Sequence, residues 1–199
     1  MAVISAPALV PGDEQLLSRW AKGDREALED LFQRYRSVAY RVAYRLLGNE
    51  ADALDAVQNG FVKALTHLPG FQRRSTFKTW LLRVVSNASL DFGRQRGRRE
   101  SLSMDGLGVQ ERENLEPPTL VNPASRLERE DLRQQLQEAL ARLPEAQRRT
   151  FVLHAEAELS YREVADILGI SIGTVMSRLY YARQKLRALL KERYGESGK

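Results

Sequence analysis

The side chains best suited to binding chemistry lie between Ile172 and Leu190, where a helical pattern contains no acidic residue. Its polar positions are hydroxyl, phenol and cationic groups: Thr174, Ser177, Arg178, Tyr181, Arg183 and Lys185. The first turns of such a helix can contact base edges in a major groove, while arginine and lysine contact phosphates. The pattern favours binding of duplex DNA, although an ordinary amphipathic helix with a solvated basic face has the same composition.

A second group of candidate side chains lies between Phe71 and Arg99. Four arginines close this segment: Arg94, Arg96, Arg98 and Arg99. Guanidinium groups bind phosphates, but arginine runs are also common in solvated tails. Three aromatic residues open the segment: Phe71, Phe77 and Trp80. Aromatic rings of this kind either stack on unpaired bases or belong to a hydrophobic core, and the sequence leaves both alternatives open.

The sequence offers no catalytic or metal-binding constellation. The absence of cysteine excludes disulfides, thiolate zinc sites and cysteine catalysis. The two histidines, His67 and His154, are far apart, and neither has a partner at metal-ligand spacing. No serine can be tied by sequence to a histidine and an acid. We therefore expect a protein that is not an enzyme and that has no cofactor and no metal.

The basic face needs a helix that presents it, and the residues before it supply one. Ser160 and Glu163 have the spacing of a capping box, which predicts that a short helix begins there. Gly169 is the residue type that ends a helix in the left-handed conformation, and Ser171 can cap a second helix. The segment therefore predicts a helix, a tight turn and a second helix.

The remaining strong patterns are also helical. One of them predicts a helix from the apolar pattern of Ala53, Leu54, Val57, Phe61, Ala64, Leu65 and Leu68, which ends at the turn signal Pro69-Gly70. Ser75 is expected to cap the following helix. Periodicity disappears from Glu100 to Val121, which predicts a linker. We expect an all-α protein with a disordered tail (1–12) and two small helical domains (13–99 and 122–199) joined by a flexible linker (100–121), the C-terminal one a helix-turn-helix.

Composition agrees with a nucleic-acid partner. The chain has 199 residues, a net charge of +5 and a pI near 9.6, which favours a polyanionic ligand. The first twelve residues lack both basic residues and a long apolar run, so we expect no signal peptide and no membrane insertion. The expected location is cytoplasmic.

Two segments resemble, in order, the two conserved domains of the extracytoplasmic-function (ECF) sigma factors of bacterial RNA polymerase, in the sigma-70 family. The first domain is similar to residues 24–99, which include ADALDAVQNGFVKAL and STFKTWLLRVVSNASLD. The second is similar to LARLPEAQRRTFVLHAEAELSYREVADILGISIGTVMSRLYYARQKL. The resemblance implies a transcription initiation factor that binds core RNA polymerase, directs it to specific promoters and helps to melt the minus-10 element.

The resemblance also implies roles for particular residues. Core polymerase binding is implied for Asp52, Asp55, Gln58 and Phe61. Binding of the minus-10 element is implied for Phe71, Ser75, Trp80, Asn87, Asp91, Arg94 and Arg96. Binding of the minus-35 element is implied for Thr174, Met176, Ser177, Arg178, Tyr180, Tyr181 and Arg183. A separate anti-sigma factor is the expected regulator.

Three positions depart from the family pattern. Leu54 and Asn59 stand where many members have acidic residues, so the expected polymerase-docking surface is less charged. Met176 stands where members often have a basic residue. A methionine offers no bidentate contact to guanine, and it favours an apolar contact with a thymine methyl group instead.

Two other functions are compatible with the residues themselves. An autonomous helix-turn-helix regulator would bind duplex DNA without polymerase and would favour symmetric half-sites. An interaction module that imitates a sigma factor would bind its protein partners without supporting initiation.

Overall fold

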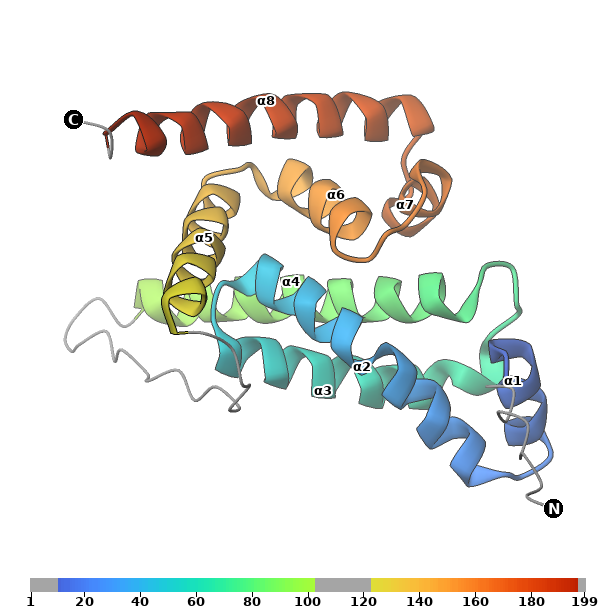
Figure 1. The fold of residues 1–199 in the computed structure, drawn as a ribbon. Coiled ribbons are helices and arrows are strands. Elements are labelled where there is room, and N and C mark those ends of the chain that lie inside the picture. Colours follow the sequence, from blue (N-terminus) through green and yellow to red (C-terminus); the bar gives the residue numbers. More distant parts are fainter. Residues whose placement is uncertain (1–10, 103–122, 197–199) are drawn as a thin grey trace, which may run out of the picture. The chain divides into compact units, whose positions relative to one another are not determined.

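The structure is a computed structural model that describes residues 11–102 and 123–196, with side chains for residues 11–99 and 131–191. The described residues form helices and no strand, which confirms the predicted all-α class (Figure 1). The helices are α1 (Asp13–Ala21), α2 (Arg25–Leu47), α3 (Glu50–His67), the short 3-10 helix η1 (Leu68–Gly70), α4 (Phe77–Leu102), α5 (Pro123–Ala141), α6 (Glu145–Ala155), α7 (Tyr161–Leu168) and α8 (Ile172–Glu196). Most of the predicted tail and linker lies outside the described residues, and residues 100–102 continue α4.

The chain divides into two compact units between Ser37 and Val38, inside α2. In the first unit, Leu16, Leu17 and Leu31 are buried. Asp13 accepts hydrogen bonds from the Arg34 guanidinium and the Tyr35 hydroxyl. These contacts tie α1 to the first half of α2.

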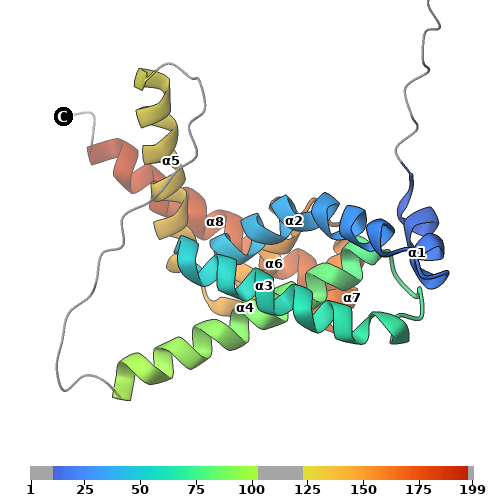
Figure 2. The ribbon, with the colours of Figure 1, turned by 90° about the horizontal axis from the view of Figure 1, so that it is seen from below.

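In the second unit, α3 and α4 lie side by side and run antiparallel (Figures 1 and 2). The contact is close at Gly60, where an added Cβ would lie 3.1 Å from Val85 Cα. A larger residue at this position would therefore require the two helices to move apart by a few tenths of an ångström. The start of α4 differs from the prediction, because Thr76 and not Ser75 is the capping residue. Thr76 Oγ1 accepts a hydrogen bond from the Thr79 amide at 3.1 Å. Thr76 is one residue closer to the first turn of α4 than Ser75.

The predicted helix-turn-helix is formed by α7 and α8, which pack on each other and on α6 (Figure 1). Ser160 Oγ accepts from the Glu163 amide, and the Glu163 carboxylate accepts from the Ser160 amide, so the capping box is confirmed. Gly169 ends α7 with φ of 64°. Ser171 Oγ then accepts from the Thr174 amide at 3.1 Å and caps α8.

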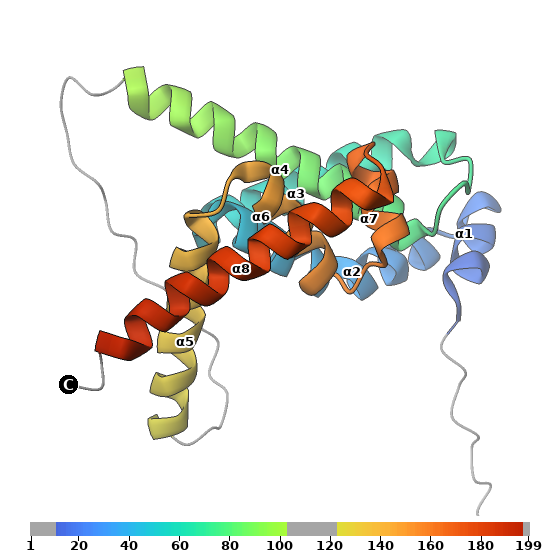
Figure 3. The ribbon, with the colours of Figure 1, turned by 90° about the horizontal axis from the view of Figure 1, so that it is seen from above.

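Helix α8 is held by apolar contacts along one side. Val175, Leu179, Ala182 and Leu186 recur at helical spacing and are buried. Helix α5 also contacts α8 (Figure 3). Because one side of α8 is covered, the polar side chains between the buried positions are presented outward.

Candidate functional site

The residues predicted to read DNA on α8 do not form one continuous set. Met176, Tyr180 and Arg183 line one open groove. Tyr181 lines a separate hollow with Lys185, Gln147 and Pro144. Helical geometry explains the division, because positions 176, 180 and 183 lie on one flank of α8 and position 181 lies about 100° further round.

The other three predicted residues on α8 differ in exposure. Ser177 is exposed, whereas Thr174 and Arg178 are half-buried. Thr174 Oγ1 lies 2.9 Å from Ser171 Oγ, so its hydroxyl is engaged in the turn between the two helices. Ser177 is thus the most accessible of the three.

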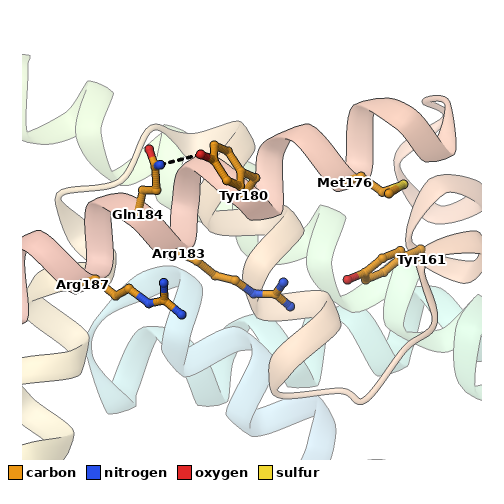
Figure 4. Close-up of a pocket in the computed structure, with 6 residues that line it drawn as sticks. All are labelled: Tyr161, Met176, Tyr180, Arg183, Gln184 and Arg187. Atoms are coloured by element: carbon orange, nitrogen blue, oxygen red, sulfur yellow. Dashed lines mark hydrogen bonds between the residues drawn. The ribbon is translucent and has the colours of Figure 1, made fainter.

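The groove on α8 has a volume of about 500 Å³ and is built from both helices of the helix-turn-helix (Figure 4). Its lining adds three side chains that the sequence did not single out: Tyr161, Gln184 and Arg187. Tyr161 is the first residue of α7, and its ring lies edge-on to the His154 ring with centroids 5.0 Å apart. The sequence signal that points to Arg187 is its spacing, four residues after Arg183 within the acid-free stretch.

An acidic residue at the start of α7, Glu163, has a shifted pKa. Burial opposes ionisation of Glu163, but hydrogen bonds from Ser160 and Thr79 outweigh it and lower the pKa of the Glu163 carboxyl. The charged form therefore stabilises the capping box on which the position of α7 depends. Arginine side chains supply the charge of the groove itself, so the arrangement suits a polyanion.

The aromatic residues before and within α4 form one cluster. The Phe71 ring lies 5.0 Å from the Trp80 ring and 6.1 Å from the Phe77 ring, centroid to centroid. Phe77 is buried, whereas Phe71 and Trp80 are half-buried. Phe77 is therefore a core residue, and the other two present part of their rings outward.

The polar residues predicted for the minus-10 element lie along α4, except for Ser75, and most of them have partners. Asn87 Oδ1 accepts from the Arg149 guanidinium. Arg94 donates to Glu145 at 2.7 Å, and Arg96 pairs with Asp52. Asp91 is exposed, with its carboxylate 4.0 Å from Lys63 Nζ. Ser75 is half-buried in the loop before α4.

The residues predicted to bind polymerase lie on α3 in three different environments. Asp55 and Gln58 are exposed, and Phe61 is half-buried. Asp52 belongs to the helix start, where it accepts from Asn49 Nδ2 at 2.6 Å. Asp52 thus stabilises the first turn of α3 in addition to any contact with a partner.

The helix predicted from this apolar pattern is present as α3, but not all of its apolar side chains are buried. Leu54 is 48% exposed and Leu65 is 44% exposed, while Ala53, Val57 and Ala64 are buried. Val62 is also 57% exposed. The small residues of α3 face α4, and the helix turns these larger side chains outward. We call Leu54, Val62 and Leu65 the apolar stripe of α3; Gln58 lies within it.

The fold defines an all-α protein with a helix-turn-helix, and comparisons with known proteins identify its family. Residues 31–99 match the family model for sigma-70 region 2, and residues 133–186 match the one for sigma-70 region 4. The chain is 36% identical over 181 residues to the ECF RNA polymerase sigma factor SigE of Mycolicibacterium smegmatis, covering 89% of this chain and 68% of that protein. It is 30% identical over 173 residues to SigW of Bacillus subtilis, covering 86% and 92%.

Two solved structures are also similar. CnrH, in complex with the cytosolic domain of CnrY, aligns with a TM-score of 0.67 and 28% identity over 90% of this chain and 97% of that one. The sigma factor RpoE of Bartonella quintana, in complex with the anti-sigma factor NepR, aligns with a TM-score of 0.63 and 31% identity over 82% and 98%.

This chain belongs to the ECF sigma factors of RNA polymerase. It is a transcription initiation factor and not an enzyme, as the sequence predicted, and the family favours this function over an autonomous regulator. Of the helices in the described part of the chain, none has the length and hydropathy that a membrane span requires.

Proposed function

We propose that the two conserved segments divide the work of initiation between them. Residues 13–99 bind core RNA polymerase and the minus-10 element, and residues 122–199 bind the minus-35 element. The observation that carries the second assignment is the groove on α8, whose lining combines two arginines, two tyrosines and an amide without any carboxylate. Such a lining suits phosphates and base edges together.

Within the first segment, the exposed face of α3 is the polymerase-docking surface. Asp55 and Gln58 supply its polar contacts, Phe61 and the apolar stripe supply its hydrophobic area, and Asp52 lies at its edge. Leu54 then contributes to binding, because covering an exposed leucine with a protein partner removes apolar surface from water and lowers the free energy of the complex.

The aromatic cluster and α4 bind the minus-10 element. The outward parts of the Phe71 and Trp80 rings stack on an unpaired base, while Ser75, Asn87, Asp91, Arg94 and Arg96 supply polar and phosphate contacts. Because Asn87 and Arg94 have protein partners in this structure, promoter binding must exchange those hydrogen bonds for contacts with DNA. On α8, Thr174, Met176, Ser177, Arg178, Tyr180, Tyr181 and Arg183 form the minus-35 surface.

A separate anti-sigma factor is the proposed regulator, and the cytoplasm the proposed location. The similarity to RpoE of Bartonella quintana, whose structure is a complex with an anti-sigma factor, supports the proposed regulator. The proposed location follows from the family, because a sigma factor acts together with RNA polymerase.

The test is a titration of the fluorescently labelled chain with bacterial core RNA polymerase, followed by anisotropy. We expect saturable binding that an Asp55→Ala, Gln58→Ala variant weakens. The matched control is Asp131→Ala, Gln134→Ala, which removes the same two residue types at the same spacing from exposed positions of α5. Equal weakening by both variants would contradict the assignment of the docking surface to α3.

A further inference from the structure

Gln184 makes a contact on α8 that the assigned DNA-binding residues do not explain. It lies one turn after Tyr180, and its Nε2 donates a hydrogen bond to Tyr180 Oη at 2.7 Å (Figure 4). Both side chains are exposed, and Tyr180 is 57% exposed. Since neither side chain is part of the core, packing alone does not require the pair.

The hydrogen bond fixes what the Tyr180 hydroxyl can do. A free phenol both donates and accepts hydrogen bonds. When an amide N–H occupies the acceptor side of the oxygen, the hydroxyl hydrogen points away from that amide. Tyr180 is then oriented as a donor toward whatever lies in front of α8.

The neighbours of Tyr180 limit its ring as well. The Tyr181 ring lies edge-on to it, with centroids 5.4 Å apart and an interplanar angle of 76°. Met176 and Arg183 precede and follow it along the groove. The phenol is thus held from two sides, through its ring and through its oxygen.

We propose that Gln184 is a positioning residue that makes Tyr180 a hydrogen-bond donor to a base of the minus-35 element. This inference rests on the proposed function, in which α8 reads that element. In the major groove, purine N7, guanine O6 and thymine O4 are acceptors, whereas cytosine presents an amino donor. The pair therefore favours an acceptor-bearing base opposite Tyr180 and disfavours cytosine there.

The test is a selection of promoters by holoenzyme from a DNA library randomised across the minus-35 element, with wild-type and variant chains. Tyr180→Phe identifies the base pair that the hydroxyl reads. Gln184→Met, which keeps the length of the side chain but cannot donate, should reduce discrimination at that same base pair by roughly three- to tenfold. The double variant Tyr180→Phe, Gln184→Met should discriminate at that base pair as well as Tyr180→Phe alone, because Gln184 acts through Tyr180.

Gln184→Glu should change the direction of the preference. A carboxylate accepts from the Tyr180 hydroxyl, which leaves the phenol oxygen as an acceptor, so the preferred base should shift toward one that presents an amino group. A uniform loss of affinity without this shift would overturn the inference, because it would indicate a phosphate contact.

Two further outcomes would also overturn it. In the first, Gln184→Met leaves the base preference unchanged or alters a different base pair. In the second, Gln184→Met lowers the free energy of unfolding without changing the preference, as a purely structural helix pair would. A wild-type chain that binds no core polymerase and selects no promoter would instead refute the proposed function, so the two failures are distinguishable.

Discussion

The outward faces of α3 and α8 are both carried by exposed helices, but their side chains differ. The face of α3 combines the apolar stripe with Gln58 and Asp55, whereas the face of α8 combines tyrosines with Arg183 and Arg187. Burial of apolar area is insensitive to salt, while contacts between arginine and phosphate release counterions and weaken as salt rises. If the proposed roles hold, binding through the face of α3 should therefore depend less on salt than binding through the face of α8.

The two faces are also supported differently. Behind the face of α3, Gly60 allows the backbone of α4 to approach closely. Behind the face of α8, buried side chains such as Val175 and Leu179 fill the space. A close backbone contact tolerates added volume poorly, since no side chain can rotate away.

The largest effect is expected from charging the apolar stripe. Leu54→Glu, Leu65→Glu should reduce affinity for core polymerase by about a hundredfold, because two carboxylates would lose water in the interface. Anisotropy titration measures this change. Leu132→Glu is the control, since Leu132 on α5 is 50% exposed and similar in chemistry. Wild-type affinity in the double variant would mean that the apolar stripe of α3 does not contact core polymerase.

Adding volume at Gly60 tests how the face of α3 is supported. Gly60→Val should lower the free energy of unfolding by about 2 kcal/mol, because its side chain meets the backbone of Val85. Urea denaturation measures the change. Gly93→Val is the matched control, since its Cβ would meet only the end of the Leu47 side chain, at 3.3 Å. Equal destabilisation by both substitutions would count against the special role of Gly60.

Arg183→Ala tests the electrostatic character of the face of α8. Promoter affinity of the holoenzyme should fall roughly tenfold at low salt, and the dependence of log affinity on log salt should decrease by about one. Binding to core polymerase should not change. Arg142→Ala removes an exposed cation outside the groove and serves as the control. An unchanged salt dependence would mean that Arg183 does not contact a phosphate.

The smallest effect concerns the start of α7, which supports the groove. The pKa of Glu163 is lowered in the folded chain, so the unfolded chain binds the proton more readily. The stabilisation is present above the unfolded pKa of about 4.3 and is lost as pH falls through the folded value. The stability difference between wild type and Glu163→Gln should therefore shrink from pH 6 to pH 3 in urea titrations. A difference that stays constant would contradict an ionised cap.

Much of the fold follows from local sequence signals. The capping box at Ser160 and the left-handed Gly169 were predicted because such signals act within a few residues. The predicted capping residue of α4 is one position too early, since Ser75 and Thr76 are adjacent and chemically similar. The order of two sigma-70 regions was likewise predicted from their motifs, and the family comparisons confirm it.

The helices, the helix-turn-helix and the acid-free stretch of α8 could be predicted from the sequence, because apolar spacing and capping residues are local signals. Which apolar side chains of α3 are buried depends on contacts between helices. The small residues Ala53, Gly60 and Ala64 are buried, whereas Leu54 and Leu65 stay exposed. Tertiary folding also brings Tyr161 of α7 to the groove of α8, because residues on two helices meet only when the turn between them is folded.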